Sequence, residues 1–205
     1  MTADNNVSLL DNKNLYRYLR LMTHDFKPLE TDRLVMRMFD ERDLNERYVS
    51  WLNDPETVQY SEQRHRQHTL ESCASYLSAM CEKQDWFLAV LRKKDAPTHI
   101  GNLSVVFDRH NLTASISIMI GDPGARGLGF GVEAWSAVTT HLLDAGGMRK
   151  VTAGTMSVNK AMLAVARKSG MVEEGRQKRH FIYKGTEVDC VQFARFAFSP
   201  GNGKG

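Results

Sequence analysis

The chain has 205 residues, of which 42% are hydrophobic and 25% are charged, and its formal net charge is +3 at pH 7. This length and composition are typical of one soluble globular domain with a sizeable core. The small net charge argues against a nucleic-acid partner, and no stretch approaches the roughly 18 apolar residues that would predict a membrane partner.

The three cysteines, Cys73, Cys81 and Cys190, have neither metal-ligand nor redox spacing. Residues 1–14 are polar and lack the apolar core of a signal peptide. We therefore expect reduced thiols, no metal ion and a cytoplasmic location. The sequence leaves the oligomeric state open, a homodimer included.

Composition divides the chain into three parts. Residues 1–27 have polar flanks around a short predicted helix at 15–21, and we interpret them as an N-terminal extension. Residues 28–198 carry the periodic segments and are interpreted as the domain. Residues 199–205 have loop composition, which predicts a flexible tail.

In the first half of the domain, alternating and helical periodicities predict strands and helices. Asp40 and Thr69 are expected to cap two helices, and residues 53–55 to end the first of them. Residues 112–120 alternate, with Leu112 on the apolar face, and are expected to form a hairpin with the preceding strand. The predicted elements are a strand at 33–38, a helix at 43–52, an irregular polar segment at 61–68, a helix at 70–80, and strands at 86–91, 100–107 and 112–120.

In the second half, Asn159 is expected to cap a helix and Gly170 to end it. The predicted elements are a helix at 132–145, a strand at 150–155, a helix at 160–168, and strands at 176–183 and 187–197 joined by a turn at 184–185. A helix connecting the strands at 112–120 and 150–155 implies that this pair is parallel. The order therefore predicts an α/β fold of the α+β type, with one mixed, mostly antiparallel sheet and helices on both faces.

The segment Arg126-Gly127-Leu128-Gly129-Phe130-Gly131 lies between a predicted strand and a predicted helix. A glycine-rich turn lets backbone N–H groups converge, and the helix start adds partial positive charge, so such a place binds phosphate-like anions. The G-x-G-x-G spacing is not that of a dinucleotide fingerprint, and no Gly-Lys-Ser/Thr of a Walker loop follows. The glycines alone leave a purely structural turn equally open.

Four motifs in chain order carry a resemblance to a known family. They are Asp32-Arg33-Leu34-x-x-Arg37, Trp51-Leu52-Asn53-Asp54-Pro55-Glu56, Arg126-x-x-Gly129-x-Gly131, and the block from Asn159 to Lys168-Ser169-Gly170-Met171. Over residues 28–198 the chain resembles the GNAT superfamily of acyl-CoA-dependent N-acetyltransferases. The first two motifs resemble the branch that contains ribosomal-protein N-acetyltransferases.

The resemblance implies acetyl-CoA as the donor. Backbone N–H groups of residues 127–131 would bind its pyrophosphate, with Arg126 shaping the turn or offering charge. The strand before the turn would splay from its parallel neighbour and hydrogen-bond the pantetheine amides. Asn159 would contact pantetheine or the thioester besides capping its helix. The expected cofactor-binding residues are Ile118, Met119, Ile120, Arg126, Gly127, Leu128, Gly129, Phe130, Gly131 and Asn159.

The family's reaction is direct attack of an amine on the thioester, which needs a group that removes a proton from the amine. Many members carry a Glu where this chain has Ser115, and a Tyr where it has Ala166. No cysteine nucleophile is required. Substitutes for the missing groups would come from the acceptor side, and the candidates are Glu62, His65, His110 and Ser157.

The acceptor is expected to be a small-molecule amine. Residues 60–71 resemble members associated with surface-polysaccharide sugar modification, in which the acceptor is an amino group on a nucleotide-linked sugar. Several basic side chains would then face its diphosphate, and the equally open alternative is that they are solvated surface charges. These side chains are Arg64, Arg66, Arg176, Lys178, Arg179 and His180. The alternatives are a ribosomal-type protein N-terminal acetyltransferase and a non-catalytic acyl-CoA-binding module.

Overall fold

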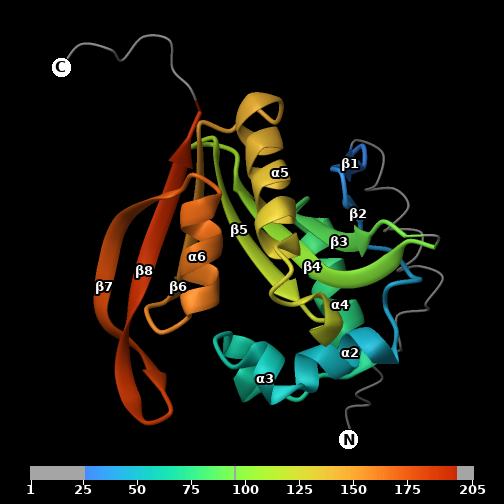
Figure 1. Cartoon of the computed structure of the whole chain (residues 1–205), viewed down its shortest axis with the longest axis horizontal. Helices are drawn as coiled ribbons and strands as arrows, with labels where there is room; N and C mark the ends of the chain where they lie inside the picture. Colours follow the sequence, from blue (N-terminus) through green and yellow to red (C-terminus); the bar gives the residue numbers. More distant parts are fainter. Residues whose placement is uncertain (1–25, 95, 198–205) are drawn as a thin grey trace, which may run out of the picture.

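The computed structural model describes residues 26–94 and 96–197, which form a single sheet with helices on both faces (Figure 1). The strands are β1 (Leu29–Glu30), β2 (Leu34–Met38), β3 (Trp86–Arg92), β4 (Thr98–Asp108), β5 (Thr113–Ile120), β6 (Lys150–Met156), β7 (Val172–Tyr183) and β8 (Thr186–Phe196). The helices are α2 (Glu46–Asn53), α3 (Pro55–Val58), α4 (Leu70–Glu82), α5 (Phe130–Asp144) and α6 (Lys160–Lys168), with 3₁₀ turns η1 (Glu62–His65) and η2 (Pro123–Ala125). The predicted helix at 15–21 and the predicted tail at 199–205 lie outside the described residues. None of the described helices is long and apolar enough to cross a membrane.

The strands lie in the order β1-β2-β3-β4-β5-β6-β8-β7. Neighbours pair antiparallel except β5 and β6, which are parallel because α5 connects them across the sheet. This confirms the predicted mixed sheet and its central parallel pair. In Figure 1, β5 and β6 diverge below their paired ends, and β7 and β8 extend as a hairpin at one edge.

Two apolar clusters lie on opposite faces of the sheet. On one face, α5 buries Trp135, Val138 and Leu142 against β2 to β6. On the other face, α4 buries Leu77 and Met80 against α2 and β3. Each such large buried side chain stabilises the fold by about 2 kcal/mol. The apolar residues whose helical spacing predicts α4 and α5 are therefore the residues that these helices bury in the core.

The first helix, α2, begins at Glu46 rather than at residue 43, so the prediction that Asp40 caps it was wrong. Asn45 is the cap, and its side chain accepts the backbone N–H of Tyr48 at 3.1 Å. Asp43 is instead buried and accepts two hydrogen bonds from the Arg37 guanidinium, at 2.6 and 2.9 Å. A buried ion pair with β2 keeps Asp43 out of the helix.

The other caps are as predicted. Thr69 and Ser72 form a reciprocal capping box at the start of α4. Asn159 accepts the backbone N–H of Met162 at the start of α6. Gly170 follows that helix with a φ of +78°, a left-handed conformation that favours glycine.

The hairpin between β4 and β5 differs from its prediction at its strand ends, since β4 runs from Thr98 to Asp108 and β5 begins at Thr113. Leu112 has a φ of +50° and belongs to the turn, where 47% of it is exposed, so it does not continue the apolar face. At the other edge, β7 begins at Val172 rather than at residue 176.

Phe26 lies in the predicted extension, but it is buried and its ring centroid is 4.7 Å from that of Trp86. The packed body therefore includes Phe26.

Candidate active site

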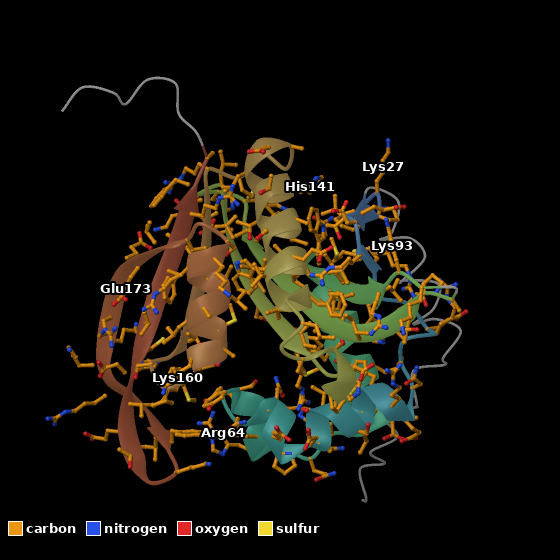
Figure 2. The ribbon with its side chains drawn as sticks, in the orientation of Figure 1. Lys27, Arg64, Lys93, His141, Lys160 and Glu173 are labelled. Atoms are coloured by element: carbon orange, nitrogen blue, oxygen red, sulfur yellow. The ribbon has the colours of Figure 1, made fainter. Side chains whose placement is uncertain are left out.

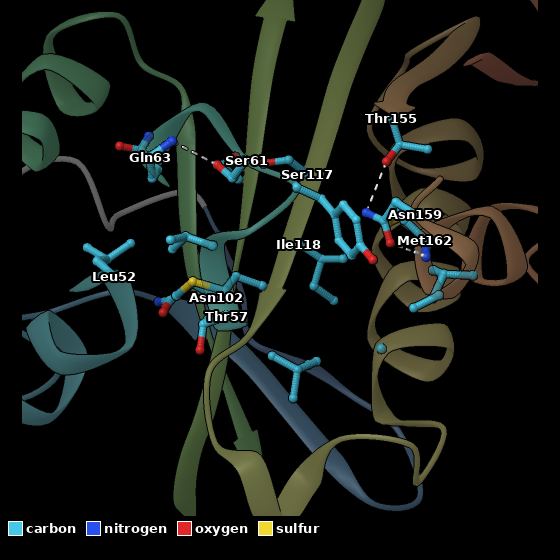
Figure 3. Close-up of a pocket in the computed structure, with 18 of the residues that line it drawn as sticks. Leu52, Thr57, Ser61, Gln63, Asn102, Ser117, Ile118, Thr155, Asn159 and Met162 are labelled. Carbon is cyan, nitrogen blue, oxygen red and sulfur yellow. Dashed lines mark hydrogen bonds between the residues drawn. The ribbon is translucent and has the colours of Figure 1, made fainter. Parts of the chain in front are cut away.

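A cavity of about 950 Å³ lies beside β5, between the starts of α5 and α6 and the segment from α3 to η1. Figure 3 shows Leu52 and Gln63 on one side of it and Asn159 on the other, with Ser117 and Ile118 of β5 between them. A cavity of this size can hold a large ligand together with a small second one.

The glycine turn at 126–131 forms one end of the cavity. Gly127 and Gly129 have φ values of +74° and +85°, which L side chains rarely adopt. Gly129 is the N-cap of α5, and it provides no side chain to cap the helix. Among the described residues, the backbone N–H groups of 127–132 donate no hydrogen bond. Successive unpaired N–H groups at a helix start can bind an anion, so the turn has the backbone geometry that the predicted anion site needs.

The gap between β5 and β6 continues the cavity from the glycine turn. The parallel pairing joins only Thr113–Ser115 to Lys150–Thr152. In contrast, β5 remains paired with β4 as far as Ile120, and β6 with β8 as far as Met156. Beyond Ser115, the facing edges of β5 and β6 are therefore not paired with each other and can bind an extended ligand, although the Ile120 carbonyl accepts the Arg126 Nε at 3.3 Å.

Backbone direction separates the three residues predicted to bind along this edge. The carbonyl of Ala114 points to β6, because it accepts the Thr152 hydroxyl, and the N–H of Gly121 points to β4. Backbone groups alternate in direction along a strand. Ile118 and Ile120 therefore direct their backbone groups into the gap, whereas Met119 directs its own toward β4.

Arg126 connects the glycine turn to α3. Its Nη2 donates to the Thr57 hydroxyl at 2.5 Å and to the Gly121 carbonyl at 3.2 Å. The same nitrogen lies 3.5 Å from Asp54, and Nη1 lies 3.8 Å from Glu56. Of the two expected roles, shaping the turn is the one that these contacts support, since nearby carboxylates offset the positive charge.

Asn159 lies across the cavity from β5. Its Oδ1 caps α6 through Met162 at 3.1 Å, and its Nδ2 donates to the Thr155 hydroxyl at 3.1 Å (Figure 3). Because a carboxamide nitrogen has two hydrogens, Asn159 keeps one donor beyond these contacts.

The other half of the cavity is polar and lies on the α4 face of the sheet. The hydroxyls of Ser104 and Ser117 are 2.6 Å apart across β4 and β5. Asn102 is 3% exposed, and its Oδ1 has no hydrogen-bond partner among the described residues. Ser72 and Tyr76 of α4 line the same half.

The tip of the β7–β8 hairpin bridges to the segment after α3. The rings of Tyr60 and Tyr183 stack with centroids 5.3 Å apart, and the Tyr183 hydroxyl donates to Gln59 at 3.0 Å. Arg64 donates to the Ile182 carbonyl at 3.3 Å, and Figure 2 shows it beside the hairpin. We call these contacts the arch; they close the polar half of the cavity on one side.

Residues 33–172 match the sequence model of the acetyltransferase (GNAT) domain. The chain belongs to the GNAT acetyltransferase family. It is accordingly an acyl-CoA-dependent N-acetyltransferase, with acetyl-CoA as co-substrate. Comparison with curated proteins gives no match.

Solved structures of GNAT enzymes share the fold. A microcin C7 self-immunity acetyltransferase in complex with acetyl-CoA and AMP is 18% identical, with a TM-score of 0.69, over 81% of this chain and 93% of the other. A ribosomal L7/L12 α-N-protein acetyltransferase in complex with coenzyme A is 18% identical, with a TM-score of 0.72, over 83% and 98%. Spermidine N-acetyltransferase from Vibrio cholerae, in complex with coenzyme A and spermine, is 16% identical, with a TM-score of 0.72, over 82% and 97%. At these identities the likeness is one of fold.

None of the four side chains predicted to assist proton transfer lines the cavity of this GNAT domain. The Glu62 and His65 side chains are 63% and 61% exposed on η1. His110 is exposed in the β4–β5 turn, at the opposite end of β5 from the glycine turn. Ser157 follows β6, and its N–H donates to the carbonyl of Asp189. Leu128, of the glycine turn, is 52% exposed and also lies outside the lining.

Of the basic side chains considered for a diphosphate, Arg66 alone lines the cavity. Arg176 and Lys178 are on the exposed strand β7 and lie near Asp189, at 3.5 and 3.7 Å. Arg179 is 3.5 Å from Glu187. His180, also exposed, packs on the Phe181 ring, and Arg64 belongs to the arch. Alternation along β7 could not reveal these pairings, which depend on the neighbouring strand.

His68 is a cavity residue of the 60–71 segment that the sequence analysis did not include among the proton-transfer candidates. Asn53 fixes its backbone from both sides, accepting its N–H at 2.8 Å and donating to its carbonyl at 2.9 Å. The ring Nε2 is buried and has no hydrogen-bond partner among the described residues. Asn53 belongs to a motif noted in the sequence, but periodicity cannot tell which residue of the irregular segment it holds.

The buried thiols have no nucleophilic role in this geometry. Cys73 lines the cavity, and burial raises the pKa of its thiol. Burial likewise raises the pKa of Cys81 and of Cys190. A raised pKa disfavours the thiolate, which is the reactive form. This agrees with a reaction that needs no cysteine.

Proposed function

We propose that the enzyme acetylates the amino group of an amino sugar, presented on a nucleotide or as a similar small amine. The observation that carries this proposal is the chemistry of the polar half of the cavity. Hydroxyl and carboxamide groups line it, and Glu56 is the one carboxylate among the described residues of the lining. Glu56 lies 3.8 Å from Arg126, which offsets its charge. Such a wall suits a ligand rich in hydroxyl groups.

The donor would bind along the other half. Unpaired N–H groups of residues 127–132 would hold the pyrophosphate, and the free edge at Ile118 would pair with pantetheine. The remaining hydrogen of Asn159 Nδ2 is available to a pantetheine or thioester oxygen. This arrangement would direct the thioester toward Ser117 and the polar half.

The amine would attack the thioester carbonyl directly. A C–N bond forms as the C–S bond breaks, the amine loses a proton, and the CoA thiolate gains one. The backbone N–H of Ile118 is directed into the gap and would stabilise the oxyanion. His68 is the histidine among the described lining residues. We assign it the role of general base, which removes the proton of the amine directly or through a relay. The unpaired Nε2 would gain a partner when the acceptor binds.

Arg66 would bind the diphosphate of a nucleotide-linked acceptor. It lines the cavity, and among the described residues no carboxylate lies within ion-pair distance of it. One fold neighbour is a complex with both acetyl-CoA and AMP, which supports a nucleotide as part of the acceptor in this fold. Other fold neighbours are named for a ribosomal-protein and a polyamine acceptor. A polycationic amine would be expected to need several carboxylates, whereas the described lining has Glu56 alone, with its charge offset by Arg126.

Release of free CoA with a panel of amines tests the proposal. The panel contains a uridine-diphosphate-linked amino sugar, the same amino sugar without its nucleotide, spermidine, and a peptide with a free N-terminus. We expect the highest kcat/KM with the nucleotide-linked sugar. A preference for spermidine or the peptide would contradict the proposal.

The Arg66→Met variant tests the diphosphate contact. Loss of a charge-assisted contact should raise the KM of the nucleotide-linked sugar by about tenfold and leave that of the free sugar unchanged. Lys178→Met is the matched control, since Lys178 is exposed on β7 outside the cavity. Equal changes in both variants would remove Arg66 from the site.

A further inference from the structure

The motif that opens the domain contains an arginine that has no place in the cavity. Neither Arg33, just before β2, nor Glu133, in the first turn of α5, lines it. Nevertheless, these two residues, 100 positions apart in the sequence, contact each other directly behind the glycine turn.

Arg33 joins Glu133 to the glycine turn. Its Nε donates to Glu133 Oε2 at 2.6 Å, and its Nη2 lies 2.5 Å from the same oxygen. Its Nη1 donates to the carbonyl of Leu128 at 3.0 Å. The guanidinium also lies over the Phe130 ring, 4.5 Å from its centroid, and a Cβ placed on Gly129 would be 3.5 Å from Nη2. One side chain thus contacts Leu128 and Phe130 of the turn and lies beside Gly129 between them.

Glu133 is held from a second direction. Its Oε1 accepts the Thr31 hydroxyl at 2.6 Å and the backbone N–H of Arg33 at 3.1 Å. Burial raises the pKa of Glu133, but these hydrogen bonds and the Arg33 charge outweigh it and hold the pKa below its usual range. Glu133 is therefore a carboxylate at neutral pH, within one turn of the unpaired N–H groups.

We propose that Arg33 and Glu133 are positioning residues that hold the glycine turn in the conformation that binds the donor pyrophosphate. The bond to the Leu128 carbonyl fixes the outer side of the turn, so that its N–H groups stay directed to the cavity. Arg33 also neutralises a carboxylate that would otherwise repel the pyrophosphate at the same helix start. This inference rests on the donor site proposed above.

Calorimetric titration with acetyl-CoA and with S-acetyl-pantetheine, which lacks the pyrophosphate, tests the proposal. Arg33→Met should weaken acetyl-CoA binding by about tenfold and leave S-acetyl-pantetheine binding unchanged. The ratio of the two affinities is the decisive quantity, because a general loss of stability would lower both. Arg33→Lys keeps the positive charge but loses the forked guanidinium, so the ratio of acetyl-CoA affinity to S-acetyl-pantetheine affinity should fall by about threefold. This variant provides the test if Arg33→Met fails to fold.

Arg92→Met is the matched control. Arg92 also lies over the Phe130 ring, at 5.8 Å, but it makes no hydrogen bond to the turn among the described residues. The ratio should equal that of the wild type. An unchanged ratio in both Arg33 variants would overturn the positioning role of Arg33 and Glu133 and leave the donor site intact. A wild-type protein that binds both ligands equally would instead overturn the donor site, and this positioning role with it.

Discussion

In the proposed function, the two halves of the cavity would recognise ligands by different means. On the donor half, the recognition groups would be backbone N–H and C=O groups of residues 118–132, presented by a glycine turn and the strand edge that faces β6. On the acceptor half they would be side chains, such as His68 and Arg66, from segments brought together by the arch. Backbone recognition tolerates most side-chain changes but not changes of conformation. The acceptor half should instead be sensitive to the loss of individual side chains.

The largest effect is expected from Gly129→Glu. A side chain there is strained at a φ of +85°, and the carboxylate would enter the anion site. Acetyl-CoA affinity should fall by more than about 100-fold in calorimetry. Gly147→Glu is the matched control, because Gly147 has a φ of +70° and open space around it but lies beyond the far end of α5. Equal affinities in the two variants would remove the turn from the donor site.

Next is His68→Gln, which keeps a polar side chain but removes the imidazole. We expect kcat to fall by about 100-fold, as for loss of a general base, with acetyl-CoA affinity unchanged. His65→Gln changes an exposed histidine of the same segment and should leave kcat as in the wild type. If His65→Gln gave the larger loss, the candidate predicted from the sequence would be favoured over His68.

Opening the arch should have a smaller effect, confined to the acceptor. Tyr183→Ala removes the stack on Tyr60 and the hydrogen bond to Gln59. The acceptor KM should rise by about fivefold, since one hydrogen bond and one aromatic pair are lost, with the donor KM unchanged. Ile182→Ala, at an exposed neighbour whose backbone bond to Arg64 is retained, is the control. A rise in the donor KM would show that the two halves are not separate.

The smallest effect is on stability against pH and involves neither half directly. Burial lowers the pKa of His99 below its ordinary 6.5, against the opposing influence of Asp43 and of the Gly101 carbonyl. The unfolded chain then binds the proton more readily. Stability is therefore fully present above about pH 6.5 and is lost as the pH falls toward the folded-state pKa. His99→Gln should lessen the drop in urea midpoint between about pH 7.5 and about pH 5.5. A wild-type slope in His99→Gln would contradict this assignment.

The local structure around the glycine turn could be predicted because its signals are local. The φ-positive glycines, the helix start after them and the cap at Asn159 each lie within a few residues of what they determine. The acceptor half could not be predicted in this way. Which residue of 61–68 enters the cavity depends on Asn53, and the closing contact of Tyr60 comes from Tyr183. The shift of α2 has the same cause, because Arg37 on β2 withdraws Asp43 from the helix.

Hydrogen exchange of the wild-type protein, with and without acetyl-CoA, tests the separation of the two halves most directly. If backbone groups hold the donor, acetyl-CoA alone should slow exchange of the amides of 127–132 and of Ile118. Peptides covering 57–68 and the arch residue Tyr183 should exchange as before until an acceptor is added. Protection that appears first at 57–68, with 127–132 unchanged, would contradict the account.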